Sequence, residues 1–378
     1  MSNEAKITEE QARSTSYKEH HEPWVRMVKR DDVSKKRAIV VRAVAIAGAL
    51  VVGGILILLI GHNPIFVYGD MINGSLGSPL VLRETTRMAI PLLITGMGIA
   101  LAFKMRFWNI GAEGQILMGG IAASYFALFH VGNMPTPILL IVMALSAAIA
   151  GGIWGFIPAF FRAKWGTNET LFTLMLNYVA LGFVLFLQTV TSWQIPGTTG
   201  HPQIDRFASA ARLPQVFGIH IGWIVVLVLA VLVHLYLTRS KQGYQLTVVG
   251  ESENTARYAG MNVSRIIIRT MIISGAIAGI VGFLQVSGAD FTLNEYTAGG
   301  VGFTAIIVAW LAHLKPSVMI FVAMFIAILE RGALRIQTVF EIPATIASVL
   351  IGIILFFMLA FEFFINYRVI FRARKENS

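Results

Sequence analysis

The stretch Trp108-Asn109-Ile110-Gly111-Ala112-Glu113-Gly114-Gln115 lies between two long apolar runs. A carboxylate and two carboxamides at membrane depth cost several kcal/mol each unless they face protein or water. The two glycines weaken a helix and free backbone groups, which must then face a cavity or neighbouring protein. This stretch, the polar break (residues 108–115), therefore predicts either a solute pathway or a break in the helix.

The remainder of the chain is strongly apolar. Of its 378 residues, 56% are hydrophobic and only 13% are charged, and the mean hydropathy is +0.71. Soluble domains carry about 25% charged residues. Apolar runs of about 20 residues recur along most of the chain, which predicts an all-α fold, a polytopic membrane helical bundle. The first 38 residues are polar and the first apolar run is too long for a signal peptide.

About ten transmembrane helices are expected. A polar cytoplasmic N-terminal tail (1–38) precedes the transmembrane domain (39–366), which contains a cytoplasmic segment (239–265), and a basic cytoplasmic tail (367–378) follows it. The predicted spans lie near residues 39–60, 86–103, 109–130, 136–161, 169–190, 219–238, 266–288, 298–313, 317–334 and 342–366.

The basic residues predict the orientation. With the N-terminus inside, 24 of the 30 Lys and Arg residues fall on cytoplasmic segments, and the rest, including Arg83, Arg87, Arg331 and Arg335, fall outside. Cytoplasmic loops are rich in Lys and Arg. We therefore expect a multi-pass protein of the cell membrane with both termini cytoplasmic. The net charge of +10 has the same origin, and no basic stripe beside aromatic residues indicates nucleic-acid binding.

A weak internal repeat fits ten spans. Gly111 and Gly114, which open the third predicted span, match Gly299 and Gly302, which open the eighth, at an offset of 188 residues. Spans two to five would then match spans seven to ten. Because the second and seventh spans run in opposite directions, the repeat would be inverted, as in many transporters.

Small residues recur at four-residue spacing inside the spans. In lipid, such residues allow helix backbones to approach closely, so they predict a tightly packed bundle. They are Gly151 and Gly155, Gly275 and Gly279, and Ser274, Ala278 and Gly282.

Polar and aromatic residues near the predicted helix breaks suit a neutral, partly planar solute. Aromatic faces stack on such a solute, and amides fix its orientation. The alternative is that the amides only hold the helix breaks together. The candidate pathway residues are Trp108, Asn109, Glu113, Gln115, Asn168, Glu169, Asn177, Phe303 and Thr304.

The sequence lacks the motifs of several common catalytic, metal-binding and nucleotide-binding sites. The chain has no cysteine, no G-x-x-x-x-G-K-[ST] phosphate loop and no HExxH helix. We expect no catalytic site, no metal site, no cofactor bound by this chain and no ATPase site of its own.

The cytoplasmic segment contains a second candidate site. Asn254 is expected to cap a short helix that ends at Gly260, and such a helix suits docking in the groove of a partner. The alternative is a surface helix without a partner. The candidate residues for docking are Glu251, Asn254, Arg257, Tyr258 and Gly260.

Four motifs together resemble permease subunits of ABC importers in the branched-chain amino acid, ribose and nucleoside group. The nearest likeness is to permeases of bacterial guanosine and purine-nucleoside uptake systems, whose receptor is a lipoprotein of the basic-membrane-protein type. The resemblance covers nearly the whole chain after residue 39. The motifs are RETTRMAIPLLITGMGIALAFKMRFWNIGAEGQILMG (83–119), NET with LMLNY (168–178), GESENTARYAGMNVSR (250–265) and AGGVGFTAIIVAW (298–310).

This resemblance implies a type II ABC importer-like fold and several partners: a second homologous permease in a heterodimer, an ABC ATPase subunit that uses the ATP, and an extracellular or periplasmic lipoprotein receptor. Residues 254–260 would be the coupling helix, and the polar break with Asn168, Glu169 and Asn177 would line the pathway. The N-terminal tail matches nothing in the family. Its Val25 and Val28 beside basic residues could form an interfacial helix.

Three other functions fit parts of the pattern. The chain could be an ABC permease for ribose-like sugars, because those permeases share the motifs. A stand-alone secondary transporter or facilitator would work without an ATPase or receptor. A scaffold protein would tolerate apolar residues at Glu113 and Gln115.

Overall fold

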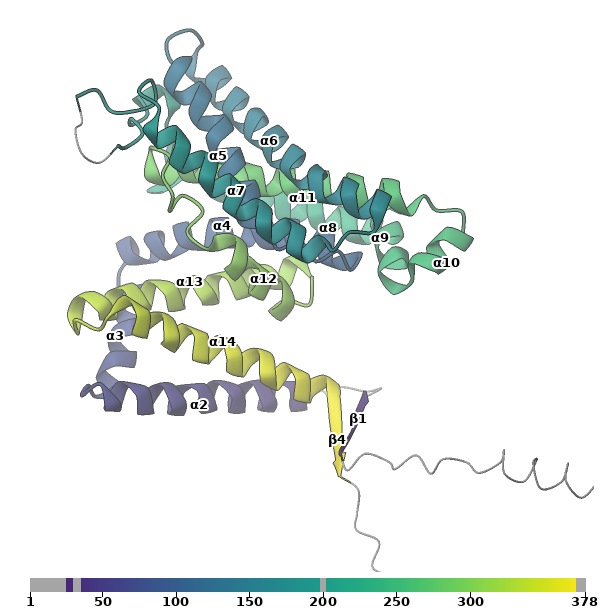
Figure 1. The fold of residues 1–378 in the computed structure, drawn as a ribbon. Coiled ribbons are helices and arrows are strands. Elements are labelled where there is room, and N and C mark those ends of the chain that lie inside the picture. Colours follow the sequence, from purple (N-terminus) through teal and green to yellow (C-terminus); the bar gives the residue numbers. More distant parts are fainter. Residues whose placement is uncertain (1–24, 30–34, 198–201, 372–378) are drawn as a thin grey trace, which may run out of the picture. The chain divides into compact units, whose positions relative to one another are not determined.

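The computed structural model describes residues 25–29, 35–197 and 202–371, and most of them are helical (Figure 1). The chain divides into two compact units. The smaller comprises residues 1–53 and 352–378, and the larger comprises residues 54–351.

The smaller unit contains most of α2 (Lys35–Leu59), most of α14 (Ala344–Asn366) and a two-stranded antiparallel sheet. Arg42 on α2 pairs with Glu362 on α14 at 3.3 Å. The sheet joins β1 (Val25–Lys29) to β4 (Tyr367–Phe371). The interfacial helix expected around Val25 and Val28 is therefore wrong for residues 25–29, whose backbone pairs with a second strand. The other residues of the predicted tails before 35 and after 371 lie outside the described residues.

The larger unit contains the remaining elements. Its backbone is helical apart from the turns, the buried non-helical segments and one short hairpin. The elements are α3 (Pro64–Leu76), α4 (Pro79–Lys104), α5 (Ala112–Phe129), α6 (Thr136–Trp165), α7 (Glu169–Thr189), η1 (Ser209–Ala211), β2 (Gln215–Val216), β3 (Ile219–His220), α8 (Gly222–Arg239), α9 (Lys241–Glu251), α10 (Glu253–Tyr258), α11 (Val263–Gln285), the π-helix η2 (Val286–Asp290), α12 (Val301–Leu311) and α13 (Pro316–Val339).

Each of the ten predicted spans coincides with a helix, and eight helices among the described residues are long and apolar enough to cross a membrane. The third and eighth predicted spans do not meet this standard. They correspond to α5 and to α12, whose 11 residues extend about 17 Å, well short of a ~30 Å hydrocarbon core. These two are also the helices that begin with the matched glycines.

Two helices were not expected from the apolar pattern, α3 and α9. Asn63 caps α3, with Pro64 at its first position, and Ser240 caps α9. Helix α4 also begins seven residues before the predicted span, and α13 extends beyond it. Arg83 therefore lies on α4, and Arg335 lies on α13, instead of in loops.

Helix α11 lies at the centre of the larger unit, against α4, α5 and α6. A Cβ added to Gly151 on α6 would overlap the carbonyl of Gly275, and one added to Gly279 would overlap the carbonyl of Ala147. A Cβ on Gly282 would overlap the carbonyl of Ile116 on α5. The predicted close packing at the small residues is confirmed, because the three helices touch through their backbones.

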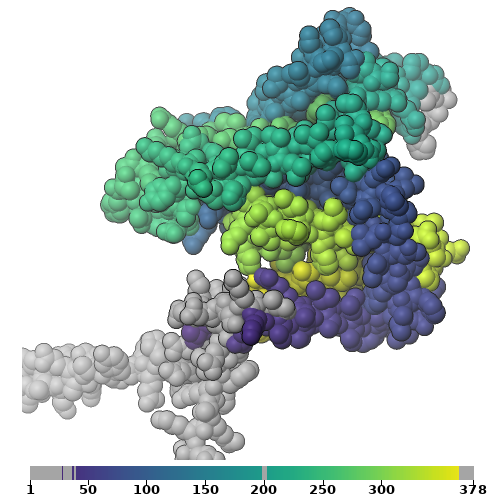
Figure 2. Space-filling model, turned by 180° about the vertical axis from the view of Figure 1, so that it is seen from behind, coloured from purple at the N-terminus to yellow at the C-terminus, as the bar shows by residue number. Residues whose placement is uncertain are grey.

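The segment predicted to be cytoplasmic (239–265) contains α9 and α10, and α10 projects at the edge of the larger unit in both views (Figure 1, Figure 2). At the base of the projection, a Cβ on Gly250 would overlap the carbonyl of Lys104, the last residue of α4. The segment is thus packed closely against the end of α4, immediately before the polar break.

Replacing Gly279 by Ala should destabilise the protein. The added methyl group has no room between α11 and α6, and overpacking of this kind costs about 1–3 kcal/mol. Thermal unfolding of the purified protein measures the change. Gly182→Ala on α7 is the matched control, because a Cβ there meets nothing within 4 Å. Equal unfolding temperatures for the two variants would contradict the close packing.

Candidate functional site

The polar break begins with a non-helical segment inside the bundle. After α4 ends, Arg106 adopts a left-handed conformation (φ 59°), and the side chains of Phe107 and Asn109 are buried. Asn109 Oδ1 accepts a hydrogen bond from the backbone N–H of Gly111 at 3.0 Å. A side chain of the polar break, that of Asn109, therefore provides a hydrogen-bond partner for the non-helical backbone after α4.

Asn109 and Gln115 form a buried amide pair across the start of α5. Each donates to the other at 3.3 Å. Asn109 Nδ2 also lies 3.5 Å from the hydroxyl of Ser274 on α11, and that hydroxyl donates to the carbonyl of Gly98 at 2.7 Å. The pair joins the break to α11 and α4.

Helix α7 holds the other side of the break. Asn177 accepts from the backbone N–H of Gly114 at 2.8 Å and donates to the carbonyl of Ile110 at 2.9 Å. The hydroxyl of Thr173 accepts from the N–H of Ile110 at 3.2 Å and donates to the carbonyl of Glu169 at 2.7 Å. These contacts satisfy backbone groups that a helix N-terminus leaves without partners.

Glu113 connects the starts of two helices. Its Oε1 accepts the backbone N–H of Gly300 at 2.7 Å, and its Oε2 accepts that of Gly302 at 2.7 Å. Both donors belong to the N-terminus of α12, and Glu113 itself lies in the first turn of α5. A negative charge is favourable at a helix N-terminus, so one carboxylate serves two helices here.

Glycines make this contact possible. Gly300, which caps α12, has φ 81°, a left-handed conformation that glycine adopts easily. A Cβ on Gly302 would overlap the backbone nitrogen of Glu113. Gly302, one of the matched glycines of the sequence, thus allows the two helix starts to meet, although the inverted repeat itself stays a prediction.

The segment before α12 is also non-helical and partly buried. Leu293, Thr297 and Ala298 are buried, and the hydroxyl of Thr297 accepts the N–H of Asn294 at 3.0 Å. Gln285, the last residue of α11, donates to the carbonyl of Thr297 at 3.4 Å. Both α5 and α12 therefore begin after irregular backbone inside the unit, a geometry that transporters use around solute sites.

A cavity of about 330 Å³ lies beside the start of α12. We call it the polar cavity because its lining includes two carboxylates, a guanidinium and an amide. The lining residues are Glu84, Arg87, Met88, Pro91, Gln285, Ala289, Ala298, Gly299, Val301 and Glu330.

Two charged groups of the polar cavity are held in place. Arg87 donates to the carbonyl of Ala289 at 2.7 Å and pairs with Glu84 at 3.7 Å. By contrast, no residue in the described part of the chain hydrogen-bonds or pairs with the carboxylate of Glu330. Glu330 is thus a carboxylate in this lining that is free to bind a solute.

His220 lies next to this region, before α8. Its ring packs against Gly288 on the π-helix, and its Nδ1 accepts the N–H of Gly222 at 3.2 Å. Burial and the positive charge of Arg87 lower the pKa of His220 to about 4. The imidazole is therefore neutral at physiological pH and adds no second positive charge beside Arg87.

Sequence reasoning did not place Glu84, Arg87 or Glu330 in a site. The signal was available, because Glu330 is a single carboxylate within an apolar run and Glu84 and Arg87 lie one turn apart. Predicting the second span to start at residue 86 left Glu84 in a loop.

None of the nine predicted pathway residues lines the polar cavity. Trp108 is 42% exposed and stacks on Trp310 at 5.6 Å, and Phe303 on α12 is also exposed. Asn168 caps α7 through the N–H of Leu171, and Glu169 pairs with Arg162.

Other predicted pathway residues lie close together. The structure brings Asn109, Glu113, Gln115 and Asn177 together around the start of α5, and Thr304 lies in the first turn of α12. Their assignment to the solute pathway stays a prediction.

The predicted docking residues lie on or beside α10. The expected cap at Asn254 is wrong: Ser252 caps the helix through the N–H of Thr255 at 3.2 Å, because the helix begins at Glu253, two residues before the start that a cap at Asn254 implies. The predicted stop is near the observed one, with Gly260 at φ 74° just after the helix. The five residues Glu251, Asn254, Arg257, Tyr258 and Gly260 are exposed.

Comparison with known proteins shows that this chain matches a protein family. The family model described as "Branched-chain amino acid transport system / permease component" matches residues 81–359. The glucose ABC transporter permease protein TsgB13 of Haloferax volcanii is 32% identical over 86% of this chain and 88% of that protein.

Two permeases of one organism are also similar to this chain. The guanosine ABC transporter permease protein NupP of Bacillus subtilis is 31% identical over 86% of this chain and 94% of its own length. NupQ, a second guanosine permease protein of that organism, is 24% identical over 60% of this chain and 73% of its own length.

Replacing Glu113 by Ala should loosen the start of α12. The N–H groups of Gly300 and Gly302, which are partly buried and buried, would lose their acceptor, at a cost of up to about 1–3 kcal/mol each. Hydrogen exchange should rise in the peptide covering residues 298–304, and thermal unfolding should occur at a lower temperature.

Glu113→Gln should give a smaller effect, because it keeps one oxygen acceptor and loses the charge. Glu251→Gln on the exposed end of α9 is the control and should change neither measurement. Unchanged exchange in the 298–304 peptide of Glu113→Ala would contradict the link between the two helix starts.

Proposed function

This chain belongs to the family of branched-chain amino acid transport system permease components, and we propose that it forms part of the solute pathway of an ATP-driven nucleoside importer. As a member of that family it is a multi-pass membrane permease subunit of an ABC transporter. The observation that carries the proposal is the polar cavity beside the joined starts of α5 and α12. Solute sites of transporters commonly form where discontinuous helices begin.

The proposed solute is a nucleoside. The volume of the polar cavity falls at the lower end of the range for small-molecule sites, about 300–1,000 Å³. Glu330 and Gln285 can accept hydrogen bonds from ribose hydroxyls or base N–H groups, and Arg87 can donate to ring nitrogens or carbonyls. The likeness to two guanosine permeases supports this class, while the likeness to a glucose permease makes a sugar the second candidate.

The proposed ATPase contact is α10. The side chain of Tyr258 is 93% exposed and that of Arg257 is 64% exposed, on a helix that projects from the unit (Figure 2). Tyr and Arg are the residue types that most often anchor protein interfaces. Because the sequence contains no phosphate-binding loop, we assign ATP hydrolysis to a separate ABC ATPase subunit and no bound cofactor to this chain.

The remaining partners are a second homologous permease and an extracellular or periplasmic solute receptor. The similarity of this chain to both guanosine permeases of Bacillus subtilis supports a heterodimer. The excess of Lys and Arg on segments predicted to be cytoplasmic supports a cell-membrane protein with both termini inside. In this orientation, α10 faces the cytoplasm, where ATP is available.

In the proposed cycle, closure of the ATPases moves α10. In response, the helical bundle exposes the polar cavity first to one side of the membrane and then to the other. The permease needs only weak contacts with the solute, because tight binding would slow its release. The receptor supplies the affinity.

The coupling function predicts the effect of a double replacement, Arg257→Ala with Tyr258→Ala. Both side chains point into solvent, so the fold should be kept while ATPase binding is lost. Uptake of radiolabelled guanosine into proteoliposomes containing all the subunits should fall to background. Lys241→Ala on the exposed face of α9 is the control. Normal uptake by the double variant, or uptake by this chain without ATPase and receptor, would support a stand-alone transporter instead.

The polar cavity predicts a role for Glu330. Glu330→Ala should lower the maximal rate of guanosine uptake about tenfold, the effect of losing one hydrogen bond to a charged group. ATPase co-purification should be unchanged, since Glu330 lies on α13 and α10 is a separate surface. Glu341→Gln, an exposed residue outside the cavity, serves as the control. An unchanged rate would exclude Glu330 from the solute path.

A further inference from the structure

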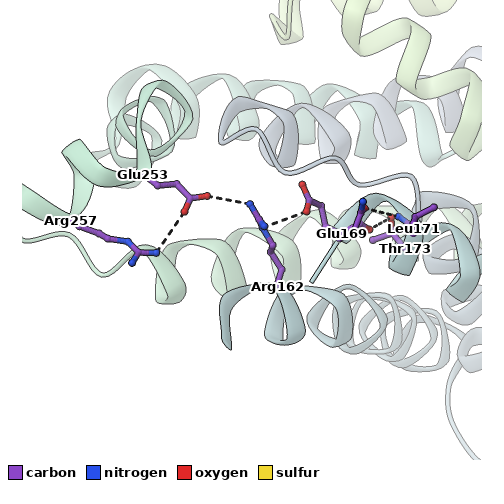
Figure 3. Close-up of polar contacts among 7 residues, drawn as sticks. Arg162, Glu169, Leu171, Thr173, Glu253 and Arg257 are labelled. Carbon is purple, nitrogen blue, oxygen red and sulfur yellow. Dashed lines mark hydrogen bonds and ion pairs between the residues drawn. The ribbon is translucent and has the colours of Figure 1, made fainter. Parts of the chain in front are cut away.

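Arg162, in the last turn of α6, lies between two carboxylates from different helices (Figure 3). Its Nε is 3.4 Å from Glu169 at the start of α7, and its Nη2 is 3.6 Å from Glu253 on α10. Arg257 on α10 lies on the far side of Glu253, at 3.7 Å. Four charges of alternating sign thus run from α10 to α7.

The turn between α6 and α7 fixes the position of Arg162. Gly166, in a left-handed conformation (φ 65°), ends α6 and donates to the carbonyl of Arg162 at 3.0 Å. Two residues later Asn168 caps α7. This tight turn holds the last turn of α6 beside the first turn of α7, so the guanidinium reaches Glu169 without an extended loop.

The inner ion pair is better shielded from water than the outer one. The side chain of Glu169 is 11% exposed and that of Arg162 is 32% exposed, while Arg257 and Glu253 are 64% and 41% exposed. Water screens exposed pairs strongly, so they hold little. A buried carboxylate needs its partner, and the Arg162–Glu169 contact is therefore the firm one.

Helix α7 extends the connection to the polar break. One turn after Glu169, the hydroxyl of Thr173 donates to the carbonyl of Glu169 and accepts the N–H of Ile110. Asn177, one turn further, binds Ile110 and Gly114. A shift of α7 therefore moves the start of α5, which Glu113 joins to α12 beside the polar cavity.

We propose that Arg162 is a positioning residue that transmits movement of α10 to the start of α5 through Glu169 and α7. The inference rests on the proposed function, because it requires an ATPase docked on α10. The direct link from α10 to α11 through Gly260 is a glycine turn with left-handed backbone, and the side-chain connection through Arg162 adds a second contact to a different helix.

The main test replaces Glu253 by Gln in the complete transporter with its ATPase and receptor. This change removes the ion pairs of Glu253 with Arg162 and with the more exposed Arg257, and it leaves the inner Arg162–Glu169 pair. Glu253 is partly exposed, so the fold should be kept. We expect normal ATPase co-purification and continued ATP hydrolysis, with the guanosine taken up per ATP reduced about two- to fivefold, the effect of losing one partly exposed ion pair. Glu341→Gln is the control.

Variants of Arg162 sharpen the test. Arg162→Lys should retain more uptake per ATP than Arg162→Gln, because it keeps the charge but loses the fork that reaches two carboxylates. Adding Glu253→Gln to Arg162→Gln should cause no further loss, since both act through one contact. A merely structural role would lower the yield of assembled transporter and leave uptake per ATP unchanged.

The outcomes separate this inference from the proposed function. If the ATPase does not bind the unmodified chain, the proposed function fails. Suppose that the ATPase binds every variant and that uptake per ATP in Glu253→Gln equals that of the unmodified chain. The proposed role of Arg162 is then wrong, and the proposed function stands. The same holds if the losses of uptake per ATP caused by Arg162→Gln and Glu253→Gln multiply in the double variant.

Discussion

The carboxylate of Glu113 joins two helix N-termini that would otherwise expose unpaired N–H groups inside the bundle. Its two oxygens accept the N–H groups of Gly300 and Gly302, both at 2.7 Å, and the residue lies in the first turn of its own helix. The positive ends of α5 and α12 can approach each other only with a negative charge between them. The non-helical segments before both helices and the adjacent polar cavity lie around this contact.

The glycines of α11 provide the setting for that contact. Backbone contact with α6 and α5 leaves no space for side chains at Gly151, Gly279 or Gly282. Helices packed this closely form a rigid support, and Asn109, Gln115 and Asn177 fix the start of α5 beside it. Conformational change can then be carried by α7 and by the end of α4, which both meet the polar break.

Much of this arrangement could be predicted from the sequence, because its signals are local. A carboxylate and amides in an apolar run mark a break, and small residues at four-residue spacing mark close packing. What could not be predicted depends on three-dimensional neighbours. The sequence pointed to Gly302 as the counterpart of Gly114, yet its contact with Glu113 needs the fold. Helices α3 and α9 are short and partly polar, so no long apolar run marks them. Either Ser252 or Asn254 could cap α10, and only the observed backbone distinguishes them.

The account stands on an ionised Glu113 that accepts hydrogen bonds on both oxygens. Infrared difference spectroscopy between the purified transporter and its Glu113→Gln variant measures this directly. We predict that the substitution removes a carboxylate stretching band that is insensitive to external pH, as expected for a shielded, doubly hydrogen-bonded group. Loss of a protonated carboxylic acid band instead would contradict the account, because a protonated Glu113 could not hold both helix starts by charge.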